Sequence, residues 1–168
     1  MRQQDRRAFI LFLSVTAFAL ALTAMYLAGH KVVHTEIVIP APTAKVWSVL
    51  SDQSSYSKWH PVIAHMEGRL EPGERIVSAW TNAEGEQHKI EADVVRYKEE
   101  RLLNLYGGTP LILTFDHRYE LEPIPEGTRV TQHEEYRGIG VLWWEPTRTS
   151  AAHASANEGL RKYVMELK

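Results

Sequence analysis

The stretch from Leu111 to Gly140 reads LILTFDHRYELEPIPEGTRVTQHEEYRGIG. Two runs of strand length are separated here by a turn rich in proline and glycine, residues 123–127. In the first run the odd positions are mainly apolar or aromatic and the even positions mainly polar, which predicts a half-buried antiparallel strand. His117 is the exception among the odd positions, and the alternation places it on the buried face.

The second run also alternates. If Val130 and Tyr136 point inward, Gln132 and Glu134 point inward with them. An inner face that mixes apolar, aromatic and polar groups favours a pocket wall over a plain core. The turn puts His117 opposite or diagonal to Glu134, within side-chain reach. As a pair facing a cavity they are candidates for acid/base catalysis, in which the carboxylate orients the imidazole. The alternative is a pair of hydrogen-bonded structural residues.

Composition limits the possible functions. The chain has 168 residues, 44% hydrophobic and 24% charged, which indicates one globular domain with a short additional segment. The net charge of -2 and the absence of a basic run argue against nucleic acid as a partner. The absence of cysteine excludes disulfides, thiolate metal sites and cysteine nucleophiles.

Histidine spacing argues against a metal site. Six histidines lie from His60 to His153, and none of them has the His-x-x-x-His spacing of a helical metal site. Alternation also puts His117 and His133 on opposite faces of their strands. We therefore expect no metal and no cofactor.

Residues 8–28 form a run of 21 residues without a charge, long enough to span a bilayer as a helix. Three arginines precede this run, so its N-terminal end is expected in the cytoplasm. A cleaved signal peptide is the alternative. The predicted organisation has four parts: a cytoplasmic N-terminus at 1–7, an anchor at 8–28, a linker at 29–31 and an extracytoplasmic domain at 32–168.

The remaining pattern predicts an α+β domain. A strand at 32–39 is followed by a helix near 44–50 and a second short helix ending before Pro61. The final segment, 151–168, has the apolar periodicity of a helix. Between them, closely spaced strands joined by tight turns favour an antiparallel meander, with candidates at about 63–70, 75–82, 88–97 and 101–106.

Seven short segments carry a resemblance to a known family: IPAP at 39–42, VWSVL at 46–50, YSKWHP at 56–61, FDHRYELEP at 115–123, GTRVT at 127–131, EEYRG at 134–138 and NEGLR at 157–161. They resemble the SRPBCC superfamily, in particular its polyketide cyclase/dehydrase-like, START-type and birch-pollen-allergen-like members. The resemblance covers about residues 32–167.

The resemblance implies a helix-grip fold. In this fold a curved antiparallel sheet of about seven strands wraps around a long C-terminal helix, and a cavity lies between the sheet and the helix. Such families bind sterols, lipids, plant hormones or polyketides; some are aromatase/cyclases and others are interaction modules. Within this fold Trp59 is either a lid or a packing residue, and Trp80 either lines the pocket or fills the interior. The pair Trp143–Trp144 either touches a membrane interface or packs against the domain.

We therefore predict a membrane-anchored domain that binds a hydrophobic small molecule or lipid, with the membrane contacted through residues 8–28. The alternatives are a polyketide cyclase/dehydrase-like enzyme that uses His117 and Glu134, and an interaction module with a vestigial cavity. The predicted ligand-binding residues are Trp59, Trp80, Phe115, His117, Tyr119, Gln132, Glu134 and Tyr136.

Overall fold

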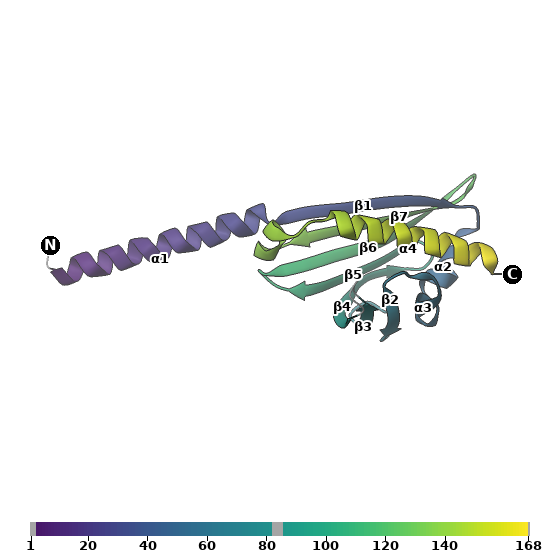
Figure 1. The fold of residues 1–168 in the computed structure, drawn as a ribbon, viewed down its shortest axis with the longest axis horizontal. Coiled ribbons are helices and arrows are strands. Elements are labelled where there is room, and N and C mark those ends of the chain that lie inside the picture. The colour runs from purple at the N-terminus through teal and green to yellow at the C-terminus, as the bar shows by residue number, and fades with distance from the viewer. Residues whose placement is uncertain (1–2, 82–85, 168) are drawn as a thin grey trace.

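The computed structural model describes residues 3–81 and 86–167, which form one long N-terminal helix and an α+β domain (Figure 1). Helix α1, Gln3–Ala28, projects away from the domain. It contains the predicted anchor and begins five residues earlier. Its apolar stretch has a mean hydropathy of 2.3 and none of it is buried against the domain. By length and composition α1 is able to cross a membrane, although a signal sequence has the same properties.

The domain is built on a curved, seven-stranded sheet in which every neighbouring pair is antiparallel. The strand order is β1-β7-β6-β5-β4-β3-β2, so the first strand joins the last and the others form a meander. This arrangement confirms the predicted fold. The strands are β1 His30–Ile39, β2 Ile63–Glu67, β3 Arg75–Thr81, β4 Gln87–Lys98, β5 Leu102–Thr109, β6 Leu113–Ile124 and β7 Gly127–Arg137.

Short helices connect β1 to β2, as predicted: α2 Thr43–Leu50, the 3₁₀ helix η1 Gln53–Ser55 and α3 Tyr56–Trp59. Pro42 is the N-cap of α2, where its missing N–H causes no loss. The apolar face of α2 is buried in the core, as its spacing predicts.

Helix α4, Thr147–Glu166, lies along β1, β7 and β6 (Figure 1). It begins four residues before the predicted start, with Pro146 as its N-cap. The 3₁₀ helix η2, Ile139–Trp143, precedes it. The buried face of α4 changes along its length: Leu160 and Val164 belong to the apolar core, whereas His153 and Asn157 are polar.

β1 begins at His30, so residues 30 and 31 of the predicted linker belong to the strand. Two predicted strand ends were also wrong, both at glycines. β2 ends at Glu67 because Gly68 has φ +110°, and a Cβ there would lie 2.4 Å from the carbonyl oxygen of Arg75. β5 continues through Gly107 to Thr109, three residues beyond its predicted end at 106. Gly107 is accommodated in the strand because it packs under the ring of Phe115, which a Cβ would meet at 2.6 Å. The end predicted for β3, residue 82, lies outside the described residues.

Candidate functional site

The register of the sheet brings the predicted polar residues onto one face. His117 pairs directly with Glu134, as expected. Tyr119 pairs with Gln132 and Phe115 with Tyr136. Because side chains alternate along each strand, these six residues share the concave face that α4 partly covers.

Glu134 is the centre of a three-residue cluster. Its Oε2 atom lies 3.4 Å from Nδ1 of His117 on β6 and 2.8 Å from Nε2 of His153 on α4. The two imidazole rings are 5.1 Å apart and nearly perpendicular. All three side chains are largely buried. The cluster thus joins β6, β7 and α4 through one carboxylate.

The electrostatics of Glu134 reflect opposing influences. Burial alone raises the pKa of the Glu134 carboxyl, but His117 and His153 lower it by more, so it lies well below its usual range. Burial raises the pKa of Tyr136, as does the negative charge of this carboxylate. Glu134 is therefore an ionised group held in a largely dry site, and Tyr136 remains a neutral donor beside it.

A third imidazole lies close to this cluster. Burial, with the charges of His117 and His153, lowers the pKa of His60 to about 3. Nδ1 of His60 accepts hydrogen bonds from the backbone N–H groups of Val62, at 3.3 Å, and Ile63, at 3.0 Å. His60 is therefore neutral near pH 7 and carries its proton on Nε2.

Gln132 fixes α4 against the sheet. Its Nε2 donates to the carbonyl oxygen of His153 at 3.1 Å and to Oδ1 of Asn157 at 2.6 Å. Asn157 in turn donates to Thr35 on β1 at 3.2 Å. Gln132, predicted to contact ligand, is thus engaged in holding the helix turn that carries His153.

The predicted aromatic residues occupy different environments. Trp59 is buried at the end of α3 and its indole N–H donates to Ser55 at 3.0 Å, as a packing residue would. Tyr119 is also buried, with its ring 4.9 Å from that of His117. Trp80 is half-buried on the concave face of β3, where it packs on His88. Phe115 is half-buried over Gly107.

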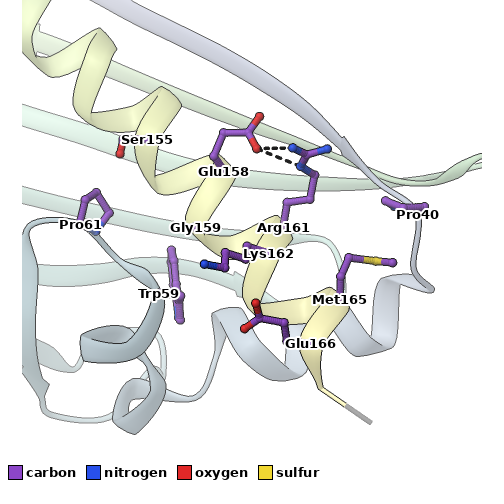
Figure 2. A pocket seen from close by; sticks show the side chains of 10 residues that line it. All are labelled: Pro40, Trp59, Pro61, Ser155, Glu158, Gly159, Arg161, Lys162, Met165 and Glu166. Atoms are coloured by element: carbon purple, nitrogen blue, oxygen red, sulfur yellow. Dashed lines mark hydrogen bonds and ion pairs between the residues drawn. The ribbon is translucent and has the colours of Figure 1, made fainter.

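An open groove of about 740 Å³ lies on the other side of α4, between this helix and α3 (Figure 2). Its walls combine apolar residues with an ion pair between Glu158 and Arg161. Trp59 is the one predicted ligand-binding residue in its lining. Gly159 of α4 lies against α3 here, since a Cβ at this position would be 2.0 Å from the carbonyl oxygen of Trp59. The lining of the groove does not include His117, Glu134 or His153.

Sequence reasoning missed His153 and His60. The signal for His153 was present, since it precedes Ala156 by three residues and Leu160 by seven, on the buried stripe of α4. The signal for His60 was weaker, because its position depends on how the α3 corner folds over the sheet.

Fold and site together define a helix-grip protein with a polar cluster on its concave face. The profile of the "Polyketide cyclase / dehydrase and lipid transport" family matches residues 30–166. The chain belongs to this family. No protein with a curated description is a significant match.

Solved structures with the same fold are distant in sequence. A protein from Rhodobacter sphaeroides has a TM-score of 0.71 and 14% identity over 82% of this chain and 93% of that one. The protein Ara h 8.0201 has a TM-score of 0.66 and 16% identity over 82% and 99%. The di-domain ARO/CYC StfQ from the steffimycin biosynthetic pathway has a TM-score of 0.68 and 10% identity over 82% and 52%. At these identities the likeness shows the fold alone.

Proposed function

We propose that the chain is a membrane-anchored member of this family that binds a hydrophobic small molecule or lipid on the concave face of its sheet. The observation that carries this proposal is the apolar surface beside the Glu134 cluster. α4 covers β1, β7 and β6, whereas Ile90 on β4 remains 37% exposed, and Trp80 and Leu105 are half-buried. Apolar walls with a few polar groups at one end are typical of ligand sites.

The family adds support, because its description includes lipid transport and its fold commonly encloses hydrophobic ligands. The groove between α3 and α4 is a weaker candidate. It is open, and charged side chains make up much of its lining, including Lys162 and Glu166. A hydrophobic ligand there would be exposed to water on one side.

A pair of matched variants tests the site. Ile90 and Tyr106 are similarly exposed, at 37% and 42%, but the strand register puts them on opposite faces of the sheet. We expect Ile90→Glu to weaken binding of the neutral probe N-phenyl-1-naphthylamine by about tenfold or more, since a carboxylate opposes an apolar ligand. Tyr106→Glu should leave binding unchanged. Equal effects, or no binding by the wild type, would refute the proposal.

Native mass spectrometry of the full chain, gently extracted from membranes, would identify the ligand. We expect a lipid or other hydrophobic molecule bound to the wild type and depleted in Ile90→Glu. A wild type that carries no such molecule would remove most of the support for a carrier and favour an interaction module.

The membrane anchor is supported by the end of the domain next to α1. A main-chain hydrogen bond joins Gly138 to Gly29, directly after α1. Further main-chain hydrogen bonds join η2 to Leu111 and Ile112, in the turn before β6. Both of these side chains are exposed, as is Trp143 on η2. Trp144 instead packs on Tyr136, with ring centroids 4.3 Å apart. Exposed apolar and indole groups beside a spanning helix suit the membrane interface.

A reporter fused after Lys168 tests the orientation. An enzyme active only outside the cytoplasm should be functional in this fusion, with the N-terminus of α1 inside. Activity of a cytoplasm-only reporter in the same position would contradict the proposed topology.

Acid/base catalysis is a second candidate function, favoured by the 3.4 Å separation of His117 and Glu134. An imidazole oriented by a carboxylate is a competent proton-transfer group. If the protein is an enzyme, His117→Ala should abolish turnover of a polyketide substrate and leave probe binding intact. Turnover that persists in this variant would exclude His117 as the acid/base residue.

A further inference from the structure

We propose that His117, Glu134 and His153 form a binding site for a divalent transition-metal ion on the concave face of the sheet. The three residues come from β6, β7 and α4, and the last lies 36 positions after the first in the sequence. The proposal departs from the expectation drawn from histidine spacing, because the fold brings together residues that spacing alone keeps apart.

The distances match those of a coordination sphere. One ligand atom from each residue can be chosen so that all three lie within 4.8 Å of one another. Ligand atoms about 2.0–2.2 Å from a tetrahedral zinc are separated from each other by about 3.3–3.6 Å. The carboxylate oxygen lies 2.8 and 3.4 Å from the two imidazole nitrogens, which is close to this spacing. Rotation of the two imidazole side chains would bring all three donor atoms, already within 4.8 Å of one another, to a common ion.

The charge of the cluster favours a cation. The side chain of Glu134 is 9% exposed, so its carboxyl group has little contact with water. Within the described residues its ion-pair partners are two histidines, with no lysine or arginine among them. An isolated buried carboxylate is costly unless a positive group balances it. A divalent ion would balance it while accepting the lone pairs of both imidazoles.

Neighbouring groups hold the ligands in place, as outer-shell residues do around metals. Tyr136 lies beside the carboxylate of Glu134 and beside Thr149 on α4. Gln132 binds the carbonyl oxygen of His153. These contacts orient two of the three ligands before any ion arrives.

His60 is not one of the ligands. Its Nδ1 is occupied by two backbone N–H groups, so Nε2 carries a proton and has no lone pair to donate. Two imidazoles and one carboxylate suit zinc, iron(II) and related ions better than calcium or magnesium. Three protein ligands also leave at least one coordination position open, the arrangement of catalytic rather than structural sites.

The experiment uses the full chain in detergent micelles, stripped with EDTA, and titrated calorimetrically with Zn²⁺ alone. We expect one equivalent to bind. His117→Ala and His153→Ala should each weaken binding by about 100-fold or more, since each removes a first-sphere ligand. The matched control is His65→Ala, which removes an exposed histidine paired with Glu67 and should leave affinity unchanged.

Glu134→Gln is a further variant that preserves shape, and circular dichroism would establish that each variant is folded. X-ray absorption at the zinc edge of the wild-type complex should show two imidazole nitrogens and carboxylate oxygen. Less than 0.1 equivalent bound to the wild type would overturn the proposal. Binding that survives both histidine variants would overturn it too, by placing zinc at surface histidines.

This inference does not depend on the proposed function, and the two fail separately. Binding of N-phenyl-1-naphthylamine to the EDTA-stripped protein tests the apolar site without zinc. Zinc binding to protein that has no hydrophobic ligand tests the metal site. A metal site with no probe binding would refute only the carrier, and probe binding without zinc binding would refute only the metal site.

Discussion

The two faces of β7 place neighbouring glutamates in different environments. Glu134 points to the concave face, where its side chain is 9% exposed and contacts histidines from β6 and α4. Glu135 points to the outer face, where its side chain is 24% exposed and pairs with Arg137 on its own strand and, at 2.9 Å, with His30 on β1. The two residues have the same chemistry and adjacent positions but different surroundings.

The difference shows what makes an ion pair important for structure. Water and a permanently charged arginine stabilise the carboxylate of Glu135, so loss of one contact is compensated. Glu134 has little water and depends on groups that other elements supply. Exposed pairs typically contribute about 0–1 kcal/mol, whereas removal of one partner from a buried pair costs about 3–5 kcal/mol. Glu134 should therefore contribute more to the free energy of unfolding than Glu135 does.

The largest expected effect comes from exchanging each carboxylate for an amide. Glu134→Gln should lower the free energy of unfolding by about 2–3 kcal/mol, because the amide keeps the shape but loses the charge that holds two imidazoles. Glu135→Gln should lower it by less than about 0.5 kcal/mol. Urea denaturation of the EDTA-treated chain, followed by tryptophan fluorescence, measures both. Equal losses would show that burial does not distinguish the two sites.

The next effect concerns pH. The pKa of His60 falls from about 6.5 to about 3 on folding, so between these values the unfolded chain binds more protons. Stability is therefore lost as pH falls through this window, by at most about 1.4 kcal/mol per pH unit. From pH 6.5 to 5 the wild type should lose about 1.5 kcal/mol. Glu134 contributes almost nothing to this slope, since it is ionised in both states above about pH 5.

His60→Asn should remove most of that slope, because its amide oxygen can still accept from the backbone but does not titrate. The outer-face control is His133→Asn. Burial also lowers the pKa of His133, but this residue is more exposed, so its variant should change the profile less. Denaturation curves at pH 5, 5.75 and 6.5 measure this. An unchanged slope in His60→Asn would show that another group is responsible.

The contrast between the faces of β7 was largely readable from the sequence, because alternation is a local property. Alternation predicted the two faces of each strand and the His117–Glu134 pair. The order of strands and helices, on which the family resemblance depends, was also predicted from the sequence. His153 could not be placed in the same way. Its position depends on the rotation and height at which α4 packs on the sheet, and these are set by contacts such as Leu160 against the core.

Boundaries failed where tertiary packing overrode local signals. Gly107 looks like a turn residue, yet it stays in β5 because Phe115 on the next strand occupies the space of a side chain. The groove beside Trp59 was also not foreseen. Its walls come from α3 and α4, and a pattern within either helix does not show that they meet at Gly159.

The smallest effect tests whether the inner face of β7 positions α4 or only packs against it. Gln132→Leu keeps the volume but leaves the carbonyl of His153 and the amide of Asn157 without their donor. The expected loss is about 1 kcal/mol, since the apolar gain offsets part of the unmet hydrogen bonding. The outer-face control, Thr131→Val, should stay within about 0.5 kcal/mol of the wild type. Hydrogen exchange should in addition become faster around His153 in Gln132→Leu alone. If hydrogen exchange around His153 is unchanged, the apolar stripe of α4 is sufficient to hold the helix. Gln132 then only packs on the concave face and does not position His153.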